Sequence, residues 1–202
     1  MSGRELVVQR GIRLEYFTLG WNFIEAAVAL AAGIAAGSIA LVGFGLDSLV
    51  EMISGAVLLW RLQVDHREED RERNERRALR MVGISFVSLS AYVAYDAATD
   101  LITREAPRTS LVGIVLAIAS LMIMFVLARA KRGVARDIES SAMHADSRQT
   151  DFCAYLSGIL LVGLALNVAF GWWWADAAAA LMMVPLIANE GREALKGESC
   201  CG

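Results

Sequence analysis

The stretch that decides the fold runs from Ser38 to Trp60 and reads SIALVGFGLDSLVEMISGAVLLW. It is long and apolar enough to cross a bilayer core of about 30 Å, which requires roughly 20 residues of apolar helix. Two carboxylates, Asp47 and Glu51, interrupt this stretch near its middle. Because each is unfavourable by about 2.5 kcal/mol or more at the centre of a membrane helix, the two acids indicate a functional site.

The rest of the chain has the composition of a helical membrane protein. Of its 202 residues, 56% are hydrophobic, and the mean hydropathy is +0.49. The few alternating runs are short, which disfavours an outer-membrane barrel. The start of the chain shows no cleavable signal peptide, and the three cysteines form no disulfide framework. The sequence therefore predicts an all-α, polytopic membrane protein.

Apolar stretches predict six transmembrane helices, at about residues 14–36, 38–62, 78–102, 111–130, 141–171 and 175–192. We interpret the dense mixed-charge run at 64–77 as a solvated loop whose ion pairs extend the neighbouring helices. The last residues leave no room for another domain, so we expect residues 1–202 to form a single transmembrane domain with no separate soluble domain.

The placement of lysine and arginine predicts the orientation. Nearly all of them lie in the N-terminus, the 64–80 segment, the 129–136 segment and the C-terminus, whereas the turn at Gly37 and the GWWWAD connection have none. Because positive residues favour the cytoplasmic side, both termini are expected to be cytoplasmic, in the inner (plasma) membrane of the cell. Trp172, Trp173 and Trp174 then form an aromatic anchor at the outer face.

The two acids of the second helix share one face, because residues four apart on a helix differ in direction by about 40°. Small residues precede and follow them, which lets neighbouring helices approach closely. One interpretation is that Asp47 and Glu51 are structural polar residues bonded to neighbouring helices. Facing a polar bundle interior, they are instead a candidate cation site, provided that another helix supplies further ligands.

The fifth helix offers such ligands. Asp146, Gln149 and Cys153 lie at i, i+3 and i+7, within about 80° of one another, and supply a carboxylate, an amide oxygen and a thiol. Together with Asp47 and Glu51 they form an oxygen and sulfur set that suits Zn²⁺ or Cd²⁺ better than Mg²⁺ or Ca²⁺.

Each fifth-helix residue also has an ordinary structural interpretation. Cys153 is alternatively a small buried hydrophobe, Gln149 a helix–helix hydrogen-bonding group, and Asp146 an ion guide or a helix cap. We expect this helix to be embedded from about Ser141, because Cys153 then lies close to the depth of the two acids. The polar segment HADSRQTD would line a watery cavity.

Other polar residues are weaker candidates. Glu25 in the first helix, with Asn22 one turn away, is interpreted as a partner of the metal ligands or a proton relay. Asp96 and Asp100 share a face near the outer end of the third helix, where an outer-vestibule surface is favoured over a second site.

At the cytoplasmic side, His144 and Asp151 share a face with Arg148 between them, and an ion pair is favoured there over a metal site. Cys200 and Cys201 in the tail are weak candidates for collecting cytosolic metal.

The segment GSIALVGFGLDSLVEMISG resembles the second-helix signature of the cation diffusion facilitator family of zinc and cadmium efflux proteins. That signature has Gly and Ser before an Ala-Leu pair, then a His or Asp followed four residues later by an acid. The resemblance implies that Asp47 and Glu51 are metal ligands. In the fifth helix, Ala145 and Asp146 match the start of the family signature, and Gln149 and Cys153 fill the positions of its His and Asp ligands.

The resemblance also implies metal–proton antiport and a homodimer. Short members of the family, built from the transmembrane domain without the C-terminal cytoplasmic domain, are most similar to this chain.

The hypothesis from the sequence is therefore an exporter of a divalent metal ion, zinc first and cadmium second, by metal/proton antiport. The ion is a transported substrate, the protein is not an enzyme, and no nucleic acid is involved. Because ligands must be deprotonated to hold metal, binding releases protons. One alternative is a proton-coupled small-molecule or multidrug antiporter, although only Phe44 and Trp60 supply aromatic rings in the second helix. Another is a non-transporting membrane metal-binding protein.

Overall fold

The computed structural model describes residues 3–63, 68–104, 108, 110–137 and 141–196. These residues form six helices and no strand: α1 (Gly3–Ala36), α2 (Ile39–Gln63), α3 (Glu68–Thr103), α4 (Leu111–Asp137), α5 (Ser141–Phe170) and α6 (Ala175–Lys196). The expected all-α architecture of six helices is therefore confirmed.

Two helices begin earlier than the apolar pattern predicted. α1 starts at Gly3 rather than near Leu14, and α3 starts at Glu68 rather than near Ala78. Residues 68–77 are thus helical rather than a loop, in agreement with the expected extension of a neighbouring helix, while residues 64–67 lie outside the described part. Acidic and basic residues three and four apart stabilise a helix in water without any apolar face, so hydropathy does not reveal it. α5 starts at Ser141, as expected.

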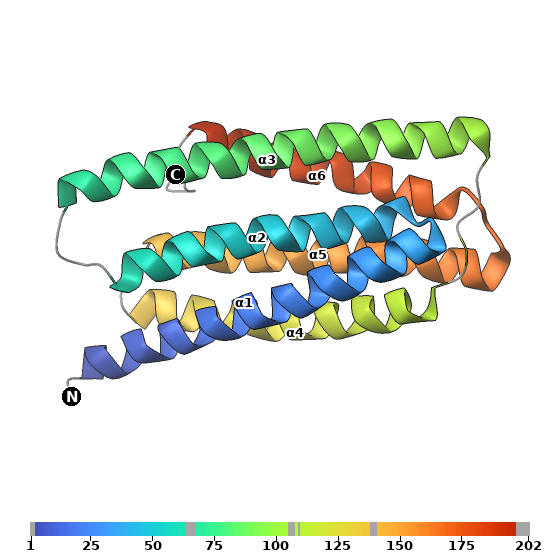
Figure 1. The fold of residues 1–202 in the computed structure, drawn as a ribbon. Helices are drawn as coiled ribbons and strands as arrows, with labels where there is room; N and C mark the ends of the chain where they lie inside the picture. The colour runs from blue at the N-terminus through green and yellow to red at the C-terminus, as the bar shows by residue number, and fades with distance from the viewer. Residues whose placement is uncertain (1–2, 64–67, 105–107, 109, 138–140, 197–202) are drawn as a thin grey trace.

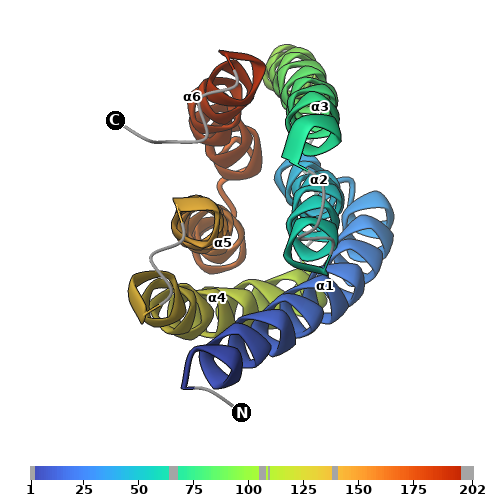
Figure 2. The same ribbon diagram turned by 90° about the vertical axis from the view of Figure 1, so that its left-hand side faces the viewer.

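The helices are arranged as a four-helix bundle with a helix pair beside it. α1, α2, α4 and α5 form the bundle, and α3 and α6 pack against each other and against α2, with α6 also contacting α5 (Figures 1 and 2). The start of α1 and the end of α6 lie at the same end of the molecule (Figure 1). Following the predicted orientation, we refer to this end as the inner end and to the opposite one as the outer end.

Two glycines shape the turns at the outer end. Gly37 and Gly171 adopt positive φ angles of 66° and 64°, a left-handed conformation that glycine accepts without steric strain. The amide of Ser38 donates to the carbonyl of Gly33 at 3.0 Å, and the amide of Gly171 donates to the carbonyl of Asn167 at 2.9 Å. The expected short turn around Gly37 is therefore present.

A buried carboxylate connects α6 to the start of α2. Asp176 accepts hydrogen bonds from Ser38 Oγ at 2.6 Å and from the amide of Ala40 at 3.2 Å. The amide of Leu41 donates to Ser38 Oγ at 3.1 Å. These bonds satisfy amides that the first turn of a helix leaves free, and they hold α2 in place beside α6.

The surface of the molecule is suited to lipid. By length and composition, three of the described helices can span a membrane, over Leu6–Ala36, Leu111–Asp137 and Asp146–Phe170. Large apolar side chains point outward from them, with Phe23 63% and Val115 67% exposed. At the outer end the exposed Trp172 and Trp174 stack with their ring centroids 5.0 Å apart, as interfacial anchors do.

Candidate metal site

One face of α1 carries a buried polar stripe. Glu15, Thr18, Asn22 and Glu25 lie at i, i+3, i+7 and i+10, and all four are buried against the rest of the bundle. Thr18 satisfies its own hydroxyl by donating to the carbonyl of Leu14 at 2.9 Å. The carboxylates of Glu15 and Glu25 and the amide of Asn22 are therefore the groups of this stripe that can bind side chains of other helices.

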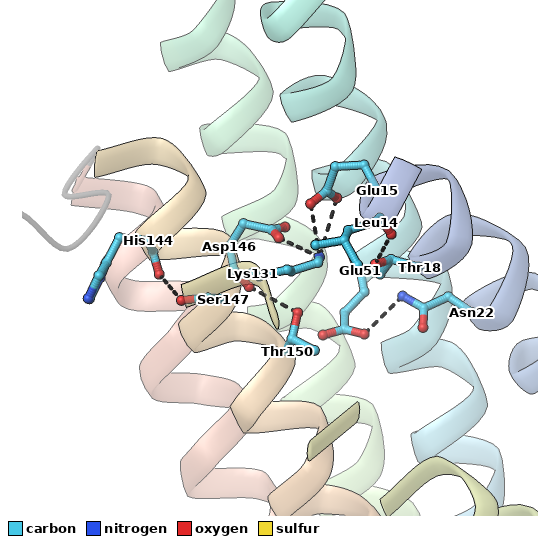
Figure 3. Close-up of polar contacts among 10 residues, drawn as sticks. All are labelled: Leu14, Glu15, Thr18, Asn22, Glu51, Lys131, His144, Asp146, Ser147 and Thr150. Atoms are coloured by element: carbon cyan, nitrogen blue, oxygen red, sulfur yellow. Dashed lines mark hydrogen bonds and ion pairs between the residues drawn. The ribbon is translucent and has the colours of Figure 1, made fainter. Parts of the chain in front are cut away.

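The α2 acids face this stripe. Asp47 is 1% exposed and Glu51 is 7% exposed. Asn22 Nδ2 donates to Glu51 Oε2 at 3.0 Å, so an α1 amide holds one of the two candidate ligands (Figure 3). Among the described residues, neither carboxylate oxygen of Asp47 has a hydrogen-bond partner, whereas Glu25 lies near the hydroxyls of Ser48 and Ser120.

From α5, Cys153 reaches the same region. Its side chain is fully buried, and its thiol lies within electrostatic range of Glu51, Glu25 and Asp47. Ser157, one turn further along, donates to the carbonyl of Cys153 at 2.8 Å. Three helices, α1, α2 and α5, thus contribute acids or a thiol to one buried region.

The other two α5 candidates lie closer to the inner end. Asp146 accepts a hydrogen bond from Lys131 of α4 at 2.5 Å, and Lys131 also lies 3.1 Å from an oxygen of Glu15 (Figure 3). Gln149 is half-buried. In this structure Asp146 is therefore bound to an ammonium group rather than grouped with the α2 acids.

The polar residues form a column through the bundle. With a helical rise of about 1.5 Å per residue, three levels follow from the distance along each helix from its outer end. They are about 12–17 Å for Asp47 and Glu25, about 18–26 Å for Glu51, Asn22 and Cys153, and about 30–36 Å for Lys131, Glu15 and Asp146. The candidate ligands are thus spread along the column.

This spread has a consequence for metal binding. In the part of the chain that the structure describes, no group of three or more His, Cys, Asp or Glu side chains is close enough to hold a metal ion. The carboxylates and the thiol supply donors that suit zinc and cadmium, but they must converge to form a tetrahedral shell.

The weaker candidates lie outside this column. Asp96 and Asp100 are partly exposed on α3, where both interact with Tyr92. His144 is exposed, and Asp151 accepts a hydrogen bond from Arg132 of α4 at 2.6 Å. Cys200 and Cys201 lie outside the described residues.

Several polar residues of the site were missed from the sequence. From the sequence, Lys131 resembles a charge at the cytoplasmic boundary, and Glu15 lies at the first residues of the first predicted helix. The spacing of Glu15 from Asn22 and Glu25 was the signal that could have revealed it. Glu190 of α6, which lies within electrostatic range of Asp47 and of Arg148, had no such signal.

Comparison with known proteins places this geometry in context. A family model described as the cation efflux transmembrane domain matches residues 17–197. Over 151 residues the chain is 30% identical to the cation-efflux pump FieF of Cronobacter sakazakii (strain ATCC BAA-894). The alignment covers 72% of this chain and 50% of FieF, so the chain spans about half the length of this curated relative. The names of the family model and of this relative both refer to cation efflux.

Proposed function

The chain belongs to the cation efflux transmembrane family, and from this premise we propose that it exports a divalent metal ion in exchange for protons, with zinc as the first candidate and cadmium as the second. The family is one of transporters, and the ion is a transported substrate rather than a resident cofactor. The proposed location is the inner (plasma) membrane, with both termini cytoplasmic and the protein acting as a homodimer.

One observation carries the proposal. Glu25 and Asp47 are buried in the bundle interior; the oxygens of Asp47 have no hydrogen-bond partner among the described residues, and Glu25 lies near the hydroxyls of Ser48 and Ser120. A buried carboxylate without a partner is strongly unfavourable unless it is protonated or neutralised by a cation. A divalent ion neutralises two such groups at once, and protons do so in its absence.

We assign the metal to Asp47 and Glu51 of α2 and Cys153 of α5, with Gln149 or Asp146 completing the shell. Because the thiolate is a soft ligand, this set favours zinc and cadmium over manganese. Glu51 of α2 and Cys153 of α5 lie within electrostatic range of each other, so metal binding would bring Asp47 to this pair.

Proton exchange follows from the same ligands. Carboxylic acids and a thiol release their protons when they bind metal, so metal entering from the cytoplasm displaces protons. Reprotonation from the outer side then weakens the site and releases the metal. Glu25, which lies within electrostatic range of Asp47 and Glu51, is assigned as the proton relay. Asn22 orients Glu51 for metal binding.

The test is metal flux in proteoliposomes under an imposed pH gradient, with zinc, cadmium and manganese. We expect zinc and cadmium flux that depends on the gradient and falls by about 100-fold in Asp47→Asn, because the substitution removes a ligand charge. The matched control is Asp137→Asn, which changes an exposed carboxylate at the end of α4. Gradient-driven flux of an organic cation without metal flux would replace the proposal with a drug antiporter. Metal binding without flux would indicate a non-transporting metal-binding protein.

A further inference from the structure

Lys131 lies where a membrane lysine is not expected. Its side chain is fully buried near the inner end of α4, although a lysine in that position ordinarily extends its ammonium to the water interface. Its Nζ donates to Asp146 Oδ2 at 2.5 Å and to Glu15 Oε2 at 3.3 Å. Two acids from two other helices therefore hold it in the bundle interior (Figure 3).

The adjacent residue shows the ordinary arrangement. Arg132 pairs with Asp151 of α5 at 2.6 Å, and the two side chains are 33% and 20% exposed. That partly exposed pair already connects α4 to α5 without burying a charge. A purely structural connection between these helices therefore does not require the buried ammonium of Lys131.

The net charge of the buried cluster of Glu15, Asp146 and Lys131 is favourable for a cation. Glu15, Asp146 and Lys131 sum to −1 when all are ionised, so the cluster has room for additional positive charge. The ammonium also lies within electrostatic range of the candidate ligand Glu51. A cation that moves from the inner end toward Glu51 along this polar column therefore meets a carboxylate pair that already holds a positive charge.

We propose that Lys131 is an intramolecular competitor for the transported metal ion, with Glu15 and Asp146 forming an entry site on the cytoplasmic path. This inference rests on the proposed function. The entering dication displaces the ammonium from Asp146, which becomes free to hold the ion at the entry site on its way to Glu51 and Cys153. When the ammonium returns to Asp146, it removes that ligand and favours release. Lys131 thus keeps metal affinity low enough for turnover.

The experiment measures zinc affinity in the purified full chain by equilibrium dialysis with zinc alone. The informative variant is the double substitution Lys131→Gln/Glu15→Gln, which keeps the cluster at −1 and frees Asp146 from the ammonium. We expect zinc to bind about tenfold more tightly or better, because Asp146 no longer holds an ammonium that the metal must displace, while the net charge of the cluster stays the same. Zinc flux at saturating concentration should fall, since release is slower. A structural role alone predicts weaker binding.

A second variant protects the test against misfolding. Lys131→Arg keeps both the charge and the carboxylate partners, and a guanidinium holds carboxylates in a bidentate geometry. We expect several-fold weaker zinc binding, because the competitor is held more firmly. The matched control is Arg132→Gln/Asp151→Asn, which removes the neighbouring α4–α5 pair and should leave zinc affinity unchanged.

The outcomes separate this inference from the proposed function. If the wild type binds and transports zinc but Lys131→Gln/Glu15→Gln binds no more tightly, or Lys131→Arg binds no more weakly, only the role of Lys131 is overturned. If the wild type binds no metal at all, both proposals fail. Tighter binding with slower flux in the first variant supports both.

Discussion

A single hydrogen bond fixes one of the candidate metal ligands. Asn22 Nδ2 donates to Glu51 Oε2 at 3.0 Å inside the bundle. Partners that orient a metal ligand typically change affinity by about 10–100-fold when they are lost. We therefore expect Asn22→Leu, which keeps the approximate size of the side chain, to raise the KM for zinc flux by about tenfold.

The control for this prediction is Asn189→Leu, because Asn189 is exposed on α6 and donates to Glu193. The measurement is the zinc dependence of flux in proteoliposomes. Equal KM values for Asn22→Leu and wild type would show that Glu51 needs no orienting partner.

The thiol of Cys153 is a second test at this scale. The side chain is fully buried within electrostatic range of Glu51. Cys153→Ser keeps the shape and replaces a soft ligand by a hard one, so we expect cadmium flux to fall by about tenfold or more, zinc flux to fall less and manganese flux to be retained. Competition between the three metals in one vesicle preparation measures the ratio of their fluxes in the variant and in the wild type. An equal loss for all three metals would assign Cys153 to packing.

Spacing in the sequence was enough to predict part of this site. A separation of four residues puts Asp47 and Glu51 on one helix face, and both are buried. Lys131 could not be found in this way, because its burial depends on Glu15 and Asp146, which other helices bring to it. At the end of an apolar stretch, a lysine is more typical of a cytoplasmic boundary.

Between elements, close approach of helices depends on small residues. A Cβ added to Gly163 of α5 would lie 2.6 Å from Cβ of Ala179 in α6, whereas one added to Gly158 of the same helix would meet nothing within 4 Å. We expect Gly163→Ala to lower the free energy of unfolding by about 1–3 kcal/mol, because α5 and α6 must move apart. Gly158→Ala should be neutral or stabilising by up to about 1 kcal/mol.

Thermal unfolding of the two variants in the same detergent checks this pair. Each substitution adds one methyl group to the same helix, so a difference between them reports the helix contact rather than helix propensity. Equal stability of the two variants would show that the α5–α6 contact relaxes freely.

Helix boundaries were less predictable than helix number. Apolar length identified six helices, since each buried or lipid-facing stretch must satisfy its backbone internally. The sequence did not predict the start of α3 at Glu68, because the first residues of this helix, EEDRERNERR, form no apolar stretch. Oppositely charged residues three and four apart favour a helix in water. Hydropathy carries no information about such an extension.

At the scale of the whole molecule, the arrangement of the helices indicates how the candidate metal site can open to either side of the membrane in turn. The α3–α6 pair packs against the four-helix bundle, and the seam between α2 and α3 contains an apolar pocket of about 300 Å³ lined by Leu46, Leu49, Val50, Ser85, Leu89 and Tyr92. The α3–α6 pair contacts the bundle through α2 and α5, and movement at these contacts would shift one group of helices against the other. Movement of this kind around a fixed site is the usual basis of alternating access.

The placement of the Lys131 site on the cytoplasmic path depends on the orientation of the chain, which the distribution of lysine and arginine predicts. Thr103 at the outer end of α3 and Arg136 near the inner end of α4 are both exposed. In a background with the three native cysteines replaced by alanine, we expect a membrane-impermeant maleimide to label Thr103→Cys on intact cells. Arg136→Cys should be labelled only after permeabilisation, because its positively charged segment stays on the cytoplasmic side. The reverse pattern would place Lys131, Glu15 and Asp146 on the outer side and would overturn their assignment as the cytoplasmic entry site.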